Sequence, residues 1–183
     1  MTRAAPIAAL LLAACGTAAI PCDGDVQGTL SFQAAADAAQ TTCTWFQDLI
    51  AAGRAGGQSF TATVSFLDAG TAALCLQRTL SQTKTGPRSG DTFTVSSTAP
   101  AAAGAVGTCP CGVDVEETFS ATLLRGTDGR VTGYRDGSLV GHLTRSGDAA
   151  ALDCYAAADA NGTSDDCPGA SAGCDVAYVL PPP

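Results

Sequence analysis

The sequence predicts a mainly β protein, an antiparallel β-sandwich or meander stapled by disulfides, with one helix over residues 34–53. Two observations predict this class. Several segments alternate apolar and polar residues, which is the period of a strand with one buried face. The chain also has 9 cysteines among 183 residues and only 5% aromatic residues, so its apolar core is light and covalent ties are expected to supplement it.

Residues 1–14 carry the features of an export signal. Arg3 supplies a positive charge before the apolar run 4–12. That run is less than half of the roughly 20 residues that a membrane-spanning helix needs, so it is interpreted as a signal and not as a span. An ordinary secretory signal, cut near Ala18 and Ala19, is the alternative.

The end of this signal, Leu12-Ala13-Ala14-Cys15, resembles the lipobox of bacterial lipoproteins. The resemblance implies cleavage before Cys15, a diacylglyceryl unit on its thiol and a third acyl chain, such as palmitate, on its amine. Two or three acyl chains hold a protein stably on a membrane. Gly16 follows at the position that sorts such proteins and implies the outer membrane or the cell surface, and residues 15–25 are interpreted as a polar tether.

Eight further cysteines remain, at Cys22, Cys43, Cys75, Cys109, Cys111, Cys154, Cys167 and Cys174. An even set in an exported protein predicts up to four disulfides, whose connectivity the sequence leaves open. Side chains two residues apart in an extended chain do not converge, so Cys109 and Cys111 are each expected to reach a different partner. Our pairing hypothesis joins Cys43 to Cys75, and joins Cys109 and Cys111 to partners among Cys154, Cys167 and Cys174.

Residues 26–148 are predicted to form the β-rich domain. Ser59 to Leu67 alternates apolar and polar residues and is expected to be a half-buried strand. The segments 74–80 and 92–96 continue in the same manner. Between them, residues 83–90 contain Gly86-Pro87 and are predicted to be a polar loop.

The longest predicted strand is 113–124. With residues 131–134 and 139–143 it is expected to form a three-stranded meander, whose second turn lies at Asp136-Gly137. Glu117 interrupts the alternating pattern, because it occupies a position of the strand where the pattern has an apolar residue. A β-bulge that turns Glu117 outward is the favoured explanation, and a place at the open end of the sheet is the alternative.

Three other segments complete the domain organisation. Residues 34–53 carry a helical apolar stripe, although Thr41 to Trp45 also has strand chemistry. Residues 100–107 are interpreted as an Ala/Gly-rich loop. Residues 149–183 are predicted to be a cysteine-rich tail that packs on the domain.

The sequence offers no arrangement that predicts catalysis. The segment 169–173 fits a nucleophile elbow around Ser171, but no strand precedes it and no histidine follows it. Glu116 and Glu117 are neighbours on a strand and face opposite ways, so they are not expected to act as paired acids. His142 is the only histidine, and a hydrolase site assembled around it is the alternative to a non-enzymatic role.

No metal site or cofactor is predicted. A single histidine and one Cys-Pro-Cys do not make a zinc site. An oxygen-rich run is a weak calcium candidate, but it lacks an acid at Ala157 and the distal Glu of an EF-hand, so a solvated acidic loop is the preferred interpretation. The residues of that run are Asp159, Asn161, Asp165 and Asp166.

Charge and resemblance define the expected function. The net charge is −8 and Lys84 is the only lysine, so no nucleic-acid partner is expected. Residues 109–143, and more loosely 167–180, resemble uncharacterised β-rich lipoproteins of Gram-negative bacteria such as myxobacteria, a family with no assigned activity. We therefore expect a lipid-anchored, non-enzymatic binding or structural module of the bacterial envelope. Its expected partners are the membrane, through the lipid, and an unknown envelope component.

Overall fold

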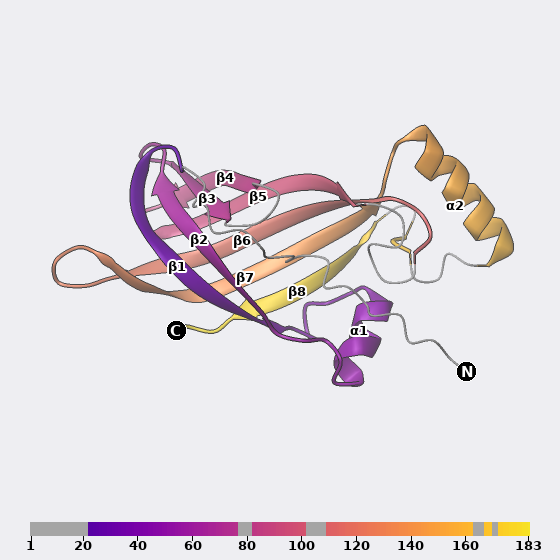
Figure 1. The fold of residues 1–183 in the computed structure, drawn as a ribbon, viewed down its shortest axis with the longest axis horizontal. Coiled ribbons are helices and arrows are strands. Elements are labelled where there is room, and N and C mark those ends of the chain that lie inside the picture. The colour runs from indigo at the N-terminus through magenta and orange to yellow at the C-terminus, as the bar shows by residue number, and fades with distance from the viewer. Residues whose placement is uncertain (1–21, 77–81, 102–108, 163–166, 170–171) are drawn as a thin grey trace.

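A computed structural model describes residues 22–76, 82–101, 109–162, 167–169 and 172–183. Cys15 and the signal therefore lie outside the described residues. The described chain contains eight strands and two helices (Figure 1). In order they are β1 (Asp25–Ala36), α1 (Thr44–Ala51), β2 (Gln58–Phe66), β3 (Thr71–Leu76), β4 (Gln82–Ser89), β5 (Thr92–Ala101), β6 (Val113–Arg125), β7 (Val131–Arg145), α2 (Ala149–Asn161) and β8 (Cys174–Leu180).

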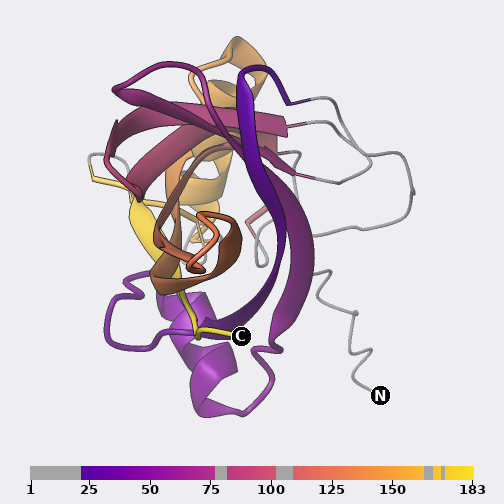
Figure 2. The same cartoon turned by 90° about the vertical axis from the view of Figure 1, so that its left-hand side faces the viewer.

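The strands form one closed antiparallel barrel, in which each strand pairs with the next along the chain (Figure 2). The mainly β, disulfide-bonded class is confirmed, whereas the prediction of a sandwich or an open meander is wrong. Closure is made by β1 and β8, where Ala35 lies opposite Val179 and Ala36 opposite Tyr178. The sequence could not show this pairing, because it joins the first and last strands of the described chain.

The alternating strand direction divides the connections between the two ends of the barrel. The connections that follow β1, β3, β5 and β7 belong to one end, here called the long-connection end, whose described residues are 37–57, 109–112, 146–162, 167–169 and 172–173. Short turns at 67–70, 90–91 and 126–130 connect strands at the other end, here called the turn end. Figure 1 shows α2 projecting from the long-connection end, and α1 lying below the strands at the same end.

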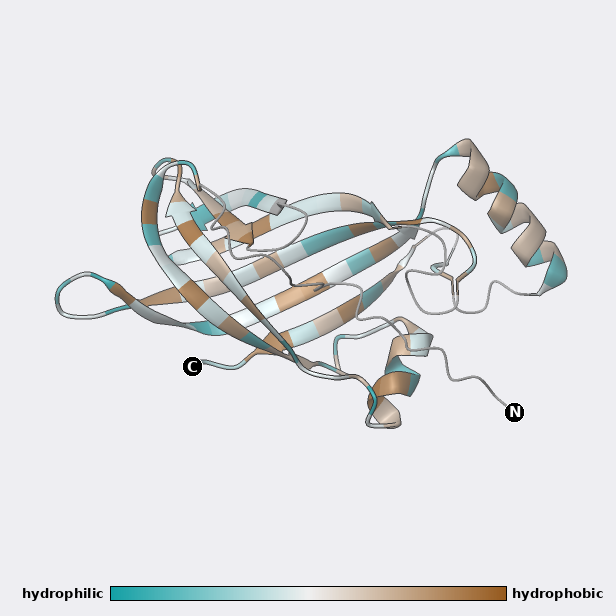
Figure 3. Cartoon of the chain, in the orientation of Figure 1, coloured by the Kyte–Doolittle hydropathy of each residue, from teal (hydrophilic) through white to brown (hydrophobic). Residues whose placement is uncertain are grey.

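Large side chains fill the described interior of the barrel. Phe32 is fully buried and contacts Phe60, Phe119 and Tyr134, with ring centroids 5.1, 5.0 and 4.5 Å away. Phe93 stacks on Phe119 at 5.7 Å. Apolar and polar residues alternate along the strands (Figure 3), so each strand contributes one face to this core.

The predicted loop 83–90 is wrong, because residues 83–89 lie in strand β4 and only Gly90 is in a turn. Two features explain the error. The side chain of Lys84 points into the barrel, although a lysine at this position normally indicates an exposed residue. The segment therefore lacks the apolar alternation by which a strand is recognised. Gly86 lets β4 approach β5 closely, because a Cβ on Gly86 would lie 2.3 Å from the carbonyl oxygen of Thr94.

Glu117 also keeps its place on the inward face. No register shift occurs at Glu117, which pairs in regular register with Ser97 on one side and Gly141 on the other. The predicted outward bulge is therefore wrong. Glu117 is 4% exposed and contacts Lys84, so the interruption in the apolar pattern reflects a buried ion pair.

Asp136-Gly137 is not a hairpin turn, because β7 runs without a break from Val131 to Arg145. The register against β6 shifts at this point, where Ser120 pairs with Ser138 and Thr122 with Arg135. Asp136 adopts a left-handed φ of 52°. The dipeptide thus forms a β-bulge, which uses the same backbone freedom as a turn but bends the strand without ending it.

The segments 34–53 and 149–183 both contribute strands to the barrel. The predicted helix is limited to α1, since β1 continues to Ala36 before it. The predicted tail contains α2 and β8, and β8 pairs with β7 over residues 174–180. The C-terminal segment therefore completes the barrel wall and does more than pack on a finished domain.

The eight cysteines of the described chain form four disulfides. These join Cys22 to Cys75, Cys43 to Cys174, Cys109 to Cys167 and Cys111 to Cys154. The expectation that Cys109 and Cys111 reach different partners in the C-terminal segment is confirmed. The pairing of Cys43 with Cys75 is wrong, because Cys43 precedes α1 beside β8 and Cys75 lies under residues 22–24 on the outer wall.

Candidate functional site

The long-connection end holds an open groove between the start of α2 and the strands that lead to it. Its volume is about 500 Å³. Its lining consists mainly of small apolar groups, with the Ser146 hydroxyl and the Asp148 carboxylate as polar ones. The lining residues are Pro100, Ala101, Pro110, Cys111, Gly112, Ser146, Asp148, Ala150, Ala151 and Cys154.

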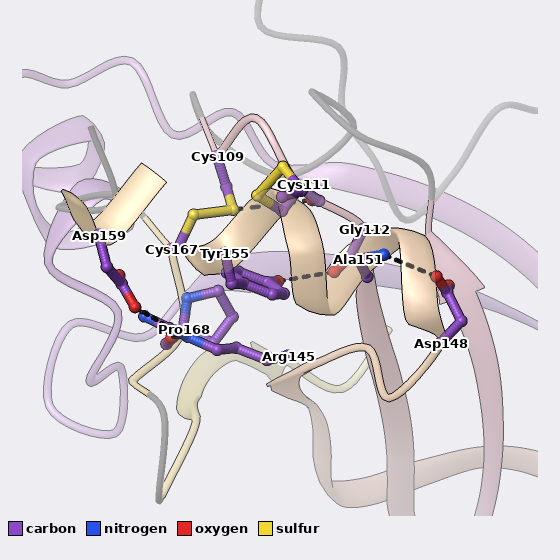
Figure 4. Close-up of a disulfide and its surroundings, with 11 residues drawn as sticks. Cys109, Cys111, Gly112, Arg145, Asp148, Ala151, Tyr155, Asp159, Cys167 and Pro168 are labelled. Carbon is purple, nitrogen blue, oxygen red and sulfur yellow. Dashed lines mark hydrogen bonds and ion pairs between the residues drawn. A yellow bond between two sulfur atoms is a disulfide. The ribbon is translucent and has the colours of Figure 1, made fainter. Parts of the chain in front are cut away.

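Two disulfides fix one wall of this groove (Figure 4). Cys109 and Cys111 lie just before β6 and are 1% and 2% exposed. Through Cys154, Cys111 is bonded to α2, and through Cys167, Cys109 is bonded to the segment that leads to β8. The Cys-Pro-Cys therefore ties three parts of the chain together at one place.

Helix α2 is held at its first turn and along its buried face. The carboxylate of Asp148 accepts a hydrogen bond from the Ala151 backbone N–H at 2.7 Å and caps the helix. Tyr155 donates its hydroxyl to the carbonyl of Gly112 at 2.6 Å. Burial raises the pKa of Tyr155, so its hydroxyl remains a donor across the neutral range.

Arg145 fastens the far side of α2. Its guanidinium binds both carboxylate oxygens of Asp159, at 2.8 and 3.0 Å, and donates to the carbonyl of Pro168 at 3.1 Å. It also lies over the ring of Tyr155, 4.5 Å from the centroid. The hydrogen bonds that Arg145 donates to the Asp159 carboxylate raise the pKa of Arg145 further above its usual value. These contacts hold α2 against the barrel, so the groove has a fixed wall that is mainly apolar and carries the Asp148 carboxylate.

The one histidine lies elsewhere, on the outer wall. His142 on β7 and Asp175 on β8 are opposite each other, with Nδ1 and Oδ1 2.7 Å apart. Both side chains are more than a third exposed. Glu116 pairs with His142 on its other side and is also exposed. Among the described residues, no hydroxyl or thiol forms a hydrogen bond with the His142 ring, so this pair has no nucleophile to activate there.

The two adjacent glutamates are separated by the sheet, as expected. Glu116 faces outward and Glu117 faces the barrel interior. Lys84 donates to Glu117 Oε2 at 2.7 Å and to the Ser97 hydroxyl at 2.6 Å. Burial and, to a smaller extent, Glu117 raise the pKa of Tyr178 to about 12. This polar cluster lies inside the barrel and is tightly packed, since Lys84 is 1% exposed.

The structure describes only part of the calcium candidate. Asp159 is bound by Arg145, so it could bind a cation only by giving up that ion pair. Asn161 is exposed at the end of α2. Asp165, Asp166 and the elbow serine Ser171 lie outside the described residues. In the described part of the chain, no cluster of three or more His, Cys, Asp or Glu side chains has the geometry of a metal site.

Sequence reasoning missed the groove and the buried Lys84. The groove has no sequence signal, because alanines, prolines and backbone atoms form its walls. The buried Lys84 did have a signal in the sequence. Glu117 lies among the inward-facing apolar residues of its strand, and a buried carboxylate needs a cation beside it. Lys84 is the only lysine of the chain.

No helix among the described residues is long and apolar enough to cross a membrane. Comparison of the chain with models of protein families, with curated proteins and with solved structures finds no match.

Proposed function

We propose that the protein is an exported, lipid-anchored module of the bacterial envelope with a non-enzymatic binding or structural role, and that a partner binds its long-connection end. The observation that carries this proposal is that three of the four disulfides lie among the connections of that end. Loops held in place lose little entropy on binding, so cross-linked connections favour recognition. Four disulfides also suit an oxidising compartment.

The packed interior supports a surface role. Phe32, Phe119 and Val64 are completely buried inside the barrel, and Phe93 is 1% exposed. An eight-stranded barrel is just wide enough either to be filled by side chains or to hold one small ligand. Phe32, Phe60, Phe93 and Phe119 contact one another and occupy interior space that a ligand would need, which favours a partner on the outside of the molecule.

Capture of envelope components by a lipid-free Cys15→Ser protein tests the binding face. Ala150 is exposed in the groove, and Ala150→Arg should reduce capture of a specific component at least tenfold because the long side chain fills the groove. Thr94→Arg places the same side chain on the exposed outer wall of β5 and should leave capture unchanged. Equal capture by all three proteins would contradict the assignment of this face.

A hydrolase centred on His142 is the second candidate, because its 2.7 Å contact with Asp175 is the geometry in which a carboxylate orients a base. A survey of ester and peptide substrates with the wild-type protein, His142→Ala and Ser171→Ala separates the two functions. We expect no turnover that depends on either residue. Turnover that falls at least a hundredfold in both variants would establish the hydrolase instead.

A further inference from the structure

The last residue of α2 is also the only asparagine of the chain, Asn161. Gly162 follows it and caps the helix in the left-handed conformation, with φ 66° and ψ 32°. Both residues are exposed. The side-chain amide of Asn161 can therefore rotate in solvent toward the backbone nitrogen of the glycine.

The backbone nitrogen of Gly162 is only weakly held. Its N–H donates to the carbonyls of Ala158 and Asp159, and the second contact is long, at 3.4 Å. A Cβ on Gly162 would meet no heavy atom of the described structure within 4 Å beyond its chain neighbours. The end of a helix also opens more readily than its middle, because fewer hydrogen bonds hold it. This nitrogen is therefore open to reaction with the neighbouring side chain.

We propose that Asn161 is a site of spontaneous deamidation, with the Gly162 nitrogen as the nucleophile. That nitrogen loses its proton to hydroxide and forms a bond to Cγ of Asn161, and the Cγ–Nδ2 bond breaks with release of ammonia. Glycine favours this ring closure because it has no Cβ to obstruct it. One water molecule then opens the succinimide ring, at Cγ to give aspartate or at the main-chain carbonyl carbon to give isoaspartate.

The modification adds a negative charge where the helix does not favour one. The new carboxylate lies at the C-terminus of α2, where the helix dipole is itself negative. Arg145 is already bound to both carboxylate oxygens of Asp159. Isoaspartate also inserts one methylene group into the backbone before the Gly162 cap. Both products should loosen the last turn of α2, whereas the groove lies at the opposite end of this helix, beside Asp148.

Peptide mapping of the full, disulfide-bonded protein after incubation at pH 8.5 and 37 °C tests this proposal. Arg145 is the last basic residue, so trypsin releases residues 146–183 as one peptide after reduction. That peptide contains Asn161 and no glutamine, so a side-chain amide lost from it comes from Asn161 alone. We expect a rate of amide loss within tenfold of the rate in the reduced, urea-denatured protein, and a higher rate at pH 8.5 than at pH 7.

Two variants separate ring closure from simple hydrolysis of an exposed amide. Gly162→Ala should slow the loss at least tenfold because its Cβ hinders the ring, even though alanine at a left-handed φ weakens the helix end. Asn161→Gln keeps an exposed amide but would need a six-membered ring, and it should also react at least tenfold more slowly. A folded protein that reacts at less than one-tenth of the denatured rate, or equal rates in the wild type and Gly162→Ala, would overturn the proposal.

Discussion

At the scale of single residues, the buried pair of Lys84 and Glu117 is sensitive to the loss of either partner. Their side chains are 1% and 6% exposed, and 2.7 Å separates Nζ from Oε2. Two ions taken out of water gain little net stability over apolar residues of similar size, but removal of one partner leaves the other charge buried without its opposite charge. The pair therefore constrains which strands lie side by side more than it stabilises the barrel.

Single and double substitutions should show this asymmetry. Lys84→Met and Glu117→Leu should each lower the free energy of unfolding by about 3–5 kcal/mol, whereas the double variant should be within about 1–2 kcal/mol of the wild type. Urea unfolding followed by circular dichroism measures all three. A double variant as unstable as the sum of the single variants would show that the pair itself stabilises the fold.

Tyr178 makes the stability depend on pH in the alkaline range. Burial and Glu117 raise the pKa of its hydroxyl to about 12, above the value near 10 of an unfolded chain. The contribution of the neutral Tyr178 hydroxyl to the free energy of unfolding is therefore complete below pH 10 and is lost as the pH rises through 12. The difference between the folded and unfolded pKa values corresponds to about 2–3 kcal/mol of unfolding free energy.

Unfolding free energies measured at pH 9 and pH 12 test this dependence. The wild type should lose more stability over that interval than Tyr178→Phe, which has no hydroxyl to titrate. Tyr134→Phe is a useful comparison, because burial also raises the pKa of Tyr134 but its hydroxyl donates to the carbonyl of Pro181. Identical pH profiles for the wild type and Tyr178→Phe would contradict the assignment.

At the scale of elements, disulfides hold segments that local interactions alone would leave weak. Strand β8 pairs with β1 at only two positions, and its first residue, Cys174, is bonded to Cys43. Helix α2 buries only Ala151, Tyr155 and Ala158, so its apolar contribution is small. Covalent bonds at the start of β8 and in the middle of α2 compensate for this light packing.

Replacement of Cys43 and Cys174 by alanine should destabilise the protein and loosen β8. The bond spans 131 residues, and loss of a native disulfide of this kind costs about 2–5 kcal/mol. Hydrogen exchange should accelerate most in β8 and at Asp37, Thr42 and Cys43, whose backbone N–H groups donate to β8 carbonyls. Alkylation without reduction, followed by mass measurement, should find none of the eight described cysteines free in the wild type. Four or more free thiols would contradict the disulfide framework.

At the scale of the whole molecule, the two barrel ends differ in the connections that they carry. The turn end carries three short turns, and the long-connection end carries both helices and the groove. Antiparallel order makes this division unavoidable, because successive connections alternate between the ends. The cross-linked connections therefore gather at one end, which is the end where we propose that a partner binds.

Cys15→Ser should abolish membrane attachment without affecting the barrel. The expected variant is an uncleaved or soluble exported protein with the same far-ultraviolet circular dichroism as the wild type, since Cys15 precedes the described fold. Membrane fractionation measures the attachment. Unchanged partitioning of Cys15→Ser would refute the lipid anchor.

The sequence by itself determined the local properties of the chain. Period-two alternation predicted the β class and the strand at β2, because side chains point to opposite faces of a strand whatever the topology. The even cysteine count predicted complete pairing, and the geometry of Cys109-Pro110-Cys111 excluded a bond between its ends. Export and lipid attachment are also local signals, and they remain predictions.

Only the tertiary structure decided how distant segments meet. Closure of the barrel through β1 and β8 turned an expected sandwich into a barrel, and it placed Cys43 beside Cys174 instead of Cys75. The burial of Lys84 depends on Glu117, which lies 33 residues away, so neither residue alone predicts the pair. Strand register and closure of the barrel set such contacts. No local pattern in the sequence specifies either one, because strands with the same alternation can form a sandwich or a barrel.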